Sequence, residues 1–311
     1  VDDLLAKVLA AGAGGLYNKV TEQDLVMCCR AVKAVFAEQP SMLEINPPVT
    51  VCGDINGNYA DVKRIFAEGG SPNETNYLFL GNYINGQRAP MQDLETILIL
   101  FCYKIKYPEN FFMLRGNYEN ATSNAINGFR DEIRNRYYSN LLWQDFNDVF
   151  NWMPQTALIG GRILCMHGGP SPRLKSLDQL RNIPRPQVIP FPSLSRDLVL
   201  SDPDAAIKGW QLNPRRGGSS YIFGQDVVID LCEMLGIDLI IRGNQVVQEG
   251  YEYFANNHLV TLWSSLNYRG QFDNNAAIMT VSEDLSVTFK KFMAKARHWN
   301  ISVFNEKGLL D

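Results

Sequence analysis

The residues best suited to do chemistry stand at the ends of five short apolar runs. Each run is rich in β-branched or aromatic residues and gives way to glycine beside Asp, Asn or His, which is typical of a buried strand that ends in a tight polar loop. The five ends carry Asp54 and Asn56 after residues 49–52, Asn82 after 76–80, Asn117 after 111–115, His167 after 162–166, and Asn244 after 239–242. We expect these ends to contribute to one shared site.

Composition excludes several classes of protein. Of the 311 residues, 46% are apolar and 20% are charged, which is typical of an ordinary soluble globular protein. The net charge of −4 is not that of a typical nucleic-acid-binding protein, which carries a basic surface. The most hydrophobic run, residues 96–103, is too short to span a bilayer. We therefore expect neither nucleic acid nor membrane as a partner.

The cysteines indicate the compartment. All lie inside apolar helix-like or strand-like runs, and none form a Cys-x-x-Cys pair. This pattern favours reduced, buried thiols in an intracellular protein of the cytoplasm or nucleus. The set is Cys28, Cys29, Cys52, Cys102, Cys165 and Cys232.

The elements that must position the strand ends alternate in type. Apolar periodicity predicts helices over residues 2–11, 21–39, 61–69, 91–107, 125–138, 141–152 and 223–235, and strands dominate after residue 239. Four prolines in residues 183–192 predict an irregular connection. We predict an α/β (α+β) fold, with a central β-sandwich flanked by helices, in one domain of residues 1–292, and a C-terminal tail over residues 293–311.

The order of these blocks resembles the phosphoprotein phosphatase family of serine/threonine phosphatases, and within it most closely the protein phosphatase 1 catalytic subunits. The matching stretches include Tyr-Lys-Ile-Lys-Tyr-Pro-Glu-Asn-Phe-Phe at residues 103–112, Ser-Asp-Pro-Asp at 201–204 and Gln-Phe-Asp-Asn at 271–274. The resemblance runs from the first helix to about Phe292 and implies a metallophosphoesterase-like fold. It also implies a pair of cations, Mn or Fe/Zn, that generate a hydroxide for attack on phosphate.

Six residues match the metal-ligand positions of that family, where its pattern is Asp, His, Asp, Asn, His and His. They are Asp54, Asn56, Asn82, Asn117, His167 and Asn244. Neutral amides therefore replace two histidines and the bridging aspartate, and Asp54 is the one formal negative charge left among the six. We expect no dinuclear centre and no resident cofactor. At most one weakly bound divalent metal would sit on Asp54, Asn117 and His167. The alternative for His167, which we favour, is a hydrogen-bonded structural histidine.

The acid–base positions of the family also differ here. Its proton-donating histidine is Tyr118, its orienting aspartate is Asn85, and its first phosphate-holding arginine is Gly86. Tyrosine has an ordinary pKa of about 10 and is a poor proton donor at neutral pH. The resemblance, with these losses, predicts a pseudophosphatase.

Some phosphate-contacting positions remain or are gained. Arg215 matches the second phosphate-holding arginine, with Arg216 one residue away as the other possible register. Tyr268 matches a tyrosine that overhangs the site in the family, and Arg269 stands where protein phosphatase 1 has a cysteine. These residues could bind phosphoserine or phosphothreonine without hydrolysis. The alternative is that the arginines are solvated on a loop.

A second surface matches the groove in which protein phosphatase 1 docks regulators that carry a basic-Val-x-Phe motif. Its positions here are Ile163, Asp238, Leu239, Tyr253, Leu285, Val287 and Phe289. In such recognition a peptide adds to a sheet edge while pockets take alternate side chains. The alternative is that these are core strand residues. Three functions stay open: an inactive scaffold or regulatory subunit, a phosphopeptide-binding module, and a weak metal-dependent serine/threonine phosphatase.

Overall fold

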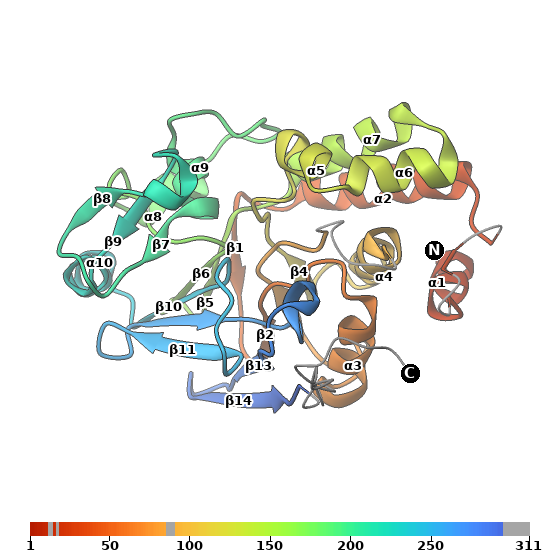
Figure 1. Cartoon of the computed structure of the whole chain (residues 1–311). Coiled ribbons are helices and arrows are strands. Elements are labelled where there is room, and N and C mark those ends of the chain that lie inside the picture. Colours follow the sequence, from red (N-terminus) through yellow and green to blue (C-terminus); the bar gives the residue numbers. More distant parts are fainter. Residues whose placement is uncertain (12–14, 17–18, 85–90, 295–311) are drawn as a thin grey trace, which may run out of the picture.

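The computed structural model describes residues 1–11, 15–16, 19–84 and 91–294 of the chain. Two β-sheets pack face to face, and helices cover the outer face of each sheet (Figure 1). The larger sheet has the order β1 (Met42–Ile45), β5 (Thr156–Ile159), β6 (Ile163–Met166), β10 (Leu239–Arg242), β12 (Leu259–Leu262) and β11 (Tyr251–Phe254). The smaller sheet has the order β14 (Val287–Phe292), β13 (Ala276–Val281), β2 (Val49–Cys52), β3 (Tyr77–Phe79) and β4 (Phe111–Met113).

The space between the sheets is filled by branched aliphatic side chains from both. Val51 and Leu78 face it from the smaller sheet, and Ile241 and Val260 face it from the larger one, all of them fully buried. The strands of a sandwich alternate inward and outward residues, so the other face of each sheet needs a cover of its own.

Helices supply that cover on both sides. The helical layer on the side of the smaller sheet consists of α1 (Asp2–Leu9), α2 (Glu22–Glu38), α3 (Tyr59–Gly69), α4 (Asp93–Lys106), α6 (Phe129–Tyr137) and α7 (Asn140–Trp152). The short helix α5 (Ala121–Ile126) packs beside α6. The larger sheet is covered by α8 (Leu177–Arg181), α9 (Leu194–Leu200) and α10 (Gln225–Leu235). A small third sheet of β7 (Asp202–Pro203), β9 (Tyr221–Phe223) and β8 (Trp210–Leu212) lies beside them, with the 3₁₀ turns η1 (Pro214–Arg216) and η2 (Tyr268–Gly270) in loops.

Parallel pairing gathers the strand ends at one edge of each sheet. Strands β2, β3 and β4 are mutually parallel, as are β6, β10 and β12. A parallel bridge between Asp54 and Trp263 joins the carboxyl end of β2 to that of β12. The two edges therefore meet, which places the polar loops of both sheets at one junction.

The predicted fold class is confirmed, with corrections inside the helical part. The predicted single helix over residues 125–138 is wrong: α5 and α6 are separate, because Gly128 adopts a left-handed backbone with φ of 100° between them. The predicted helix over residues 223–235 begins at Gln225 instead, because Phe223 ends strand β9.

Other local predictions are confirmed. The helix predicted after Thr21 begins with a capping box of Thr21 and Asp24, and residues 183–192 contain no helix or strand. All six cysteines are free and buried. The predicted tail lies outside the described residues from position 295 onward, so its boundary stays a prediction.

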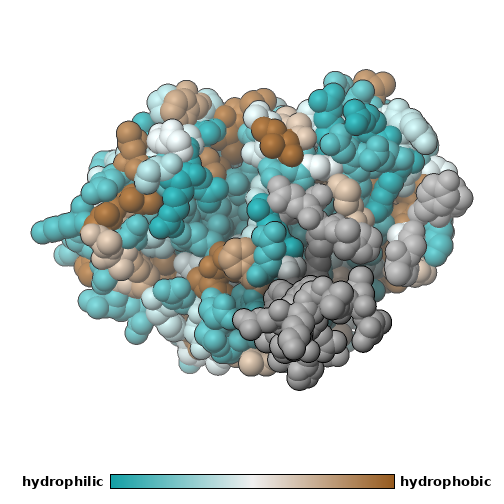
Figure 2. Space-filling view, viewed as in Figure 1, coloured by the Kyte–Doolittle hydropathy of each residue, from teal (hydrophilic) through white to brown (hydrophobic). Residues whose placement is uncertain are grey.

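The surface seen in Figure 2 is mostly hydrophilic, with separate apolar groups rather than one continuous apolar patch. Within the described part of the chain, no helix combines the length and the apolar composition needed to cross a bilayer.

Candidate functional site

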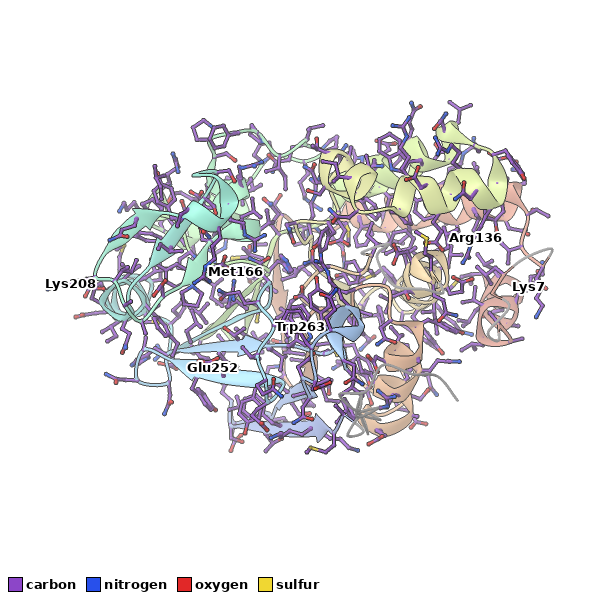
Figure 3. The ribbon with its side chains drawn as sticks, in the orientation of Figure 1. Lys7, Arg136, Met166, Lys208, Glu252 and Trp263 are labelled. Carbon is purple, nitrogen blue, oxygen red and sulfur yellow. The ribbon has the colours of Figure 1, made fainter. Side chains whose placement is uncertain are left out.

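The six strand-end residues predicted to share a site do so. Asp54, Asn56, Asn82 and His167 are all buried at the junction of the two sheets, and Asn117 and Asn244 contact them. Figure 3 labels Met166, the last residue of β6 before His167, and Trp263, which follows β12; both lie toward the middle of the molecule.

Asp54 is the centre of this site. Its Oδ1 accepts a hydrogen bond from the Asn244 backbone N–H at 2.9 Å, and its Oδ2 accepts one from Asn82 Nδ2 at 2.8 Å. The Asn56 side chain hydrogen-bonds the same carboxyl. Burial raises the pKa of Asp54 to about 7, although the hydrogen bonds from Asn244 and Asn82 oppose that shift. Both carboxyl oxygens are therefore engaged by N–H donors of this chain.

The orientation of two amides follows from partners that can only donate. Asn82 Oδ1 accepts from the Tyr118 backbone N–H at 3.0 Å, so its Nδ2 has to face Asp54. Asn244 Oδ1 accepts from Arg216 Nη2 at 3.0 Å, so its Nδ2 has to face Asp202 Oδ1, at 2.9 Å. At both positions the amide therefore turns its N–H₂ group, which cannot ligate a cation, toward a carboxylate.

The same asparagines have an unusual backbone. Asn56, Asn82 and Asn244 adopt left-handed conformations with φ of 50°, 57° and 66°. Asparagine tolerates this region better than most residues because its short side chain can hydrogen-bond locally. The loops are thus stable in this shape through their own backbone and side-chain contacts.

His167 is fully buried, and its Nε2 lies 3.1 Å from Asn117 Oδ1. Its Nδ1 lies 3.8 Å from Asp54 Oδ1. Burial, followed by the positive charges of Arg242 and Arg216, holds the pKa of His167 well below its ordinary value of 6.5. The ring is therefore neutral at physiological pH.

Glu119 ties three of the loops together. Its carboxyl accepts from the backbone N–H groups of Asn82 at 2.8 Å, Tyr83 at 2.9 Å and Gly116 at 2.9 Å. Burial raises its pKa to about 7. Its neighbour Tyr118, predicted in place of the family's proton donor, lies at the rim, where Arg269 Nη2 is 3.4 Å from its hydroxyl. Asn85 and Gly86 lie outside the described residues.

Sequence reasoning assigned no role to two charged residues that belong to the site, Asp202 and Arg242, and it named Arg216 only as the alternative register of Arg215. Arg242 is fully buried, donates to Asp202 Oδ1 at 2.7 Å, and also contacts the carbonyls of Gly168 and Ser201. Asp202 lies in the Ser-Asp-Pro-Asp stretch that matches the family, and Arg242 is the last residue of the apolar run 239–242. Both residues therefore stand in stretches that the sequence analysis had already identified.

The predicted phosphate-binding residues are only partly brought together. Arg269 stacks on Tyr268, with its guanidinium carbon 5.1 Å from the ring centroid, and Tyr268 packs edge-on against Trp263. Arg215 is exposed in η1, whereas its neighbour Arg216 reaches Asn244. Phosphate binding by Arg215, Tyr268 and Arg269 stays a prediction.

Comparison with known proteins bears on what this site is. Residues 47–248 match the model of the calcineurin-like phosphoesterases. The chain is 54% identical over 291 residues to the serine/threonine-protein phosphatase PP1-delta of Caenorhabditis elegans, covering 93% of this chain and 94% of the relative. This chain belongs to the PP1-like serine/threonine phosphatase family. Members of the metallophosphoesterase family typically bind divalent metals, and the six strand-end residues stand at positions that hold metal ligands in such members.

Solved structures agree on the architecture. A Saccharomyces cerevisiae protein serine/threonine phosphatase with similarity to human phosphatase PP5 superposes with a TM-score of 0.81 at 27% identity, covering 89% of this chain and 91% of that one. A cold-active protein-tyrosine phosphatase of Shewanella gives a TM-score of 0.58 at 14% identity over 84% of each chain, which supports the fold alone.

The donor set of this PP1-like protein does not fit a pair of divalent cations. Among the described residues, no group of three or more His, Cys, Asp or Glu side chains is arranged to hold a metal ion. Two cations a few ångströms apart need anionic oxygen between them, and the residue at the bridging position turns its amide nitrogen inward.

The raised pKa of Asp54 predicts a pH-dependent stability. The folded protein binds this proton more tightly than the unfolded chain, because the pKa is about 7 when folded and 3.8 ordinarily. The stabilising contribution is complete below about pH 4 and is lost as the pH rises to about 7. We expect the unfolding free energy of the wild type, relative to Asp54→Asn, to fall by up to about 1.4 kcal/mol per pH unit across this window, and to level off above it.

Urea unfolding in the presence of chelator measures this difference. Asp284→Asn is the matched control, because Asp284 is exposed and hydrogen bonds from Ser286 hold its pKa below the ordinary value. Its difference from the wild type should stay flat over the upper part of the window. A flat profile for Asp54→Asn as well would show that Asp54 titrates in the folded protein as it does in the unfolded chain.

Proposed function

We propose that this protein is a non-hydrolysing member of the PP1-like phosphatases, a pseudophosphatase that binds regulatory partners through a peptide-docking groove. The observation that carries the first half is the orientation of Asn82. Its Nδ2 donates to Asp54 in the position where the family has a bridging carboxylate, so the site supplies a hydrogen-bond donor where two cations would need an anion.

Loss of proton transfer supports the same conclusion. The family's proton-donating position holds Tyr118, which contacts Arg269 at the rim. A positioned general acid contributes about 10²–10⁴-fold to the rate of such reactions, so its absence alone would reduce turnover severely. With neither cations nor acid, the residues described here bind one another and activate no water.

A second candidate, a weak metal-dependent serine/threonine phosphatase, is favoured by a different observation. The relative at 54% identity is named a serine/threonine phosphatase, and the yeast structure at 27% identity carries the same description. These similarities support phosphatase activity better than they support inactivity. One experiment separates the two candidates.

The experiment is metal analysis and a phosphatase assay on purified protein in excess manganese. We expect no bound metal above background and no chelator-sensitive hydrolysis of a phosphoserine peptide. A variant that restores the family's ligands (Asn56→His, Asn82→Asp, Asn244→His) is the matched control, and we expect it to take up manganese. Two bound ions and chelator-sensitive turnover in the wild type would establish the weak phosphatase instead.

The docking half of the proposal rests on the edge strands. Strand β14 forms one edge of the smaller sheet and β11 forms one edge of the larger, so their outer backbone groups are open to pairing. Phe289 of β14 stacks on Tyr251 of β11 with ring centroids 3.8 Å apart, and Tyr253 packs edge-on against Phe289 at 5.9 Å. An aromatic floor therefore spans the two edges.

The predicted groove residues differ in how far they are buried. Ile163 and Leu239 are buried in the sandwich core, which agrees with their alternative interpretation as core residues. Leu285, Val287 and Phe289 are partly buried, and Tyr253 is 40% exposed. Asp238 already pairs with Arg162, whose Nε lies 2.8 Å from its Oδ2, so a basic peptide residue would compete with an internal arginine.

We expect peptides of the basic-Val-x-Phe type to bind this protein, and Phe289→Ala to weaken binding by about 30-fold or more, the effect of losing an aromatic hot spot. Tyr253→Ala should weaken binding as well, and its exposed ring makes misfolding less of a concern. Isothermal titration calorimetry measures both. Phe272→Ala is the control, because Phe272 is 41% exposed and lies outside the groove. Equal affinities for all four proteins would exclude docking at this surface.

A further inference from the structure

The loop between β8 and β9 holds Arg216 in a fixed direction. Its first residue, Asn213, is fully buried; its Oδ1 accepts from the Arg215 backbone N–H at 3.0 Å, and its Nδ2 donates to Asp202 Oδ2 at 3.1 Å. Gly217 and Gly218 follow with φ of 58° and 73° and turn the chain back. Of the two adjacent arginines, this turn exposes Arg215 and directs Arg216 inward.

Arg216 contacts both a carboxylate and an amide oxygen of the site. Its Nη2 donates to Asn244 Oδ1 at 3.0 Å and lies 3.6 Å from Asp202 Oδ2. Its side chain is 26% exposed. Asn244 Nδ2 in turn donates to Asp202 Oδ1 at 2.9 Å. The guanidinium therefore donates to the one side-chain oxygen that Asn244 could offer to a cation.

Two guanidinium groups face the carboxyl group of Asp202. Arg242 Nη2 lies 2.7 Å from Asp202 Oδ1, and Arg216 Nη2 lies 3.6 Å from Asp202 Oδ2. Burial raises the pKa of the other two buried carboxyl groups of the site, Asp54 and Glu119, to about 7. Arg216 therefore supplies a positive charge at the Asp202 side of the site.

We infer that the Arg216 guanidinium is a built-in cation, which occupies the side of the site next to Asn244 and Asp202 where the family would hold a metal ion. The inference deepens the proposed function and rests on it, since an arginine in this place takes up the side-chain oxygen that Asn244 would offer to a metal. Arg216, from the loop between β8 and β9, thus occupies the position that an external cation would take.

Removing the side chain should create a binding site for free guanidinium. We expect Arg216→Ala to lower the melting temperature by about 4 °C or more, because Asn244 Oδ1 loses its hydrogen-bond donor and Asp202 loses one of its two neighbouring cations. Millimolar methylguanidinium, far below denaturing concentrations, should restore most of that loss. Methylammonium at equal concentration should restore less, because it lacks the planar, multi-donor head group.

Two matched variants test whether the effect belongs to this position. Arg216→Met keeps the unbranched stem of the side chain without its charged head group and blocks part of the space that Arg216→Ala opens, so it should be destabilised and rescued less than Arg216→Ala. Arg215→Ala removes the neighbouring exposed arginine and should behave as the wild type does, with and without methylguanidinium. Equal melting temperatures for the two alanine variants, or no selective rescue of Arg216→Ala, would overturn the inference.

The test stays decisive if Arg216→Ala does not fold alone. Refolding with and without methylguanidinium then reports the same binding, and recovery of folded protein only with the cation supports the inference, whereas no difference overturns it. All samples contain chelator, so rescue is independent of metal and of turnover. Manganese-dependent hydrolysis by the wild type would overturn the proposed function, while failed rescue in chelator overturns only the assignment of Arg216.

Discussion

The close approach of β2 to β12 at Gly53 is the constraint on which the site depends. A Cβ atom at Gly53 would lie 2.1 Å from the Leu262 carbonyl oxygen and 2.9 Å from the Trp263 nitrogen, so only glycine fits. The Gly53 backbone N–H donates to Ser264 Oγ at 2.8 Å. This contact joins the parallel edges of two separate sheets. Without it, Asp54 and His167 would end on different surfaces, and the strand ends would form no common centre.

A junction so deeply buried has to satisfy its own polar groups. Carboxylates and guanidinium groups removed from water are destabilising unless each finds a partner, and here the partners come from the chain itself. Asp202 illustrates this, since it accepts from Arg242, Asn244 and Asn213 and lies beside Arg216. These contacts of Asp202 connect the small sheet of β7, β9 and β8 to the strand ends. The side chains that stabilise the site therefore also occupy its polar groups.

Much of this could be predicted from the sequence, because the signals are local. β-Branched runs that end in glycine and a polar residue identified the strands and their shared edge, and Thr21 with Asp24 identified a helix start. The break at Gly128 was missed because apolar periodicity continues across it, although Asn127-Gly128 is a dipeptide typical of turns.

The choice between Arg215 and Arg216 was likewise beyond the sequence. The two residues are adjacent and chemically identical, and their directions are set by the 3₁₀ turn and by the hydrogen bond from Asn213 to Asp202. Asp202 lies in a stretch that matches the family, yet its role depends on partners up to 42 positions away in the chain. Local pattern reveals which residues reach the junction but not how they pair there.

The left-handed asparagines have a consequence for how the protein matures. Asn56, Asn82 and Asn244 keep their loops in place through hydrogen bonds that form when the chain folds. A loop shaped by metal ligation reaches its final form only after an ion is delivered, so its maturation depends on cellular metal supply. Under the proposed function, the frame of this protein is complete once folding ends and its assembly needs no metal delivery.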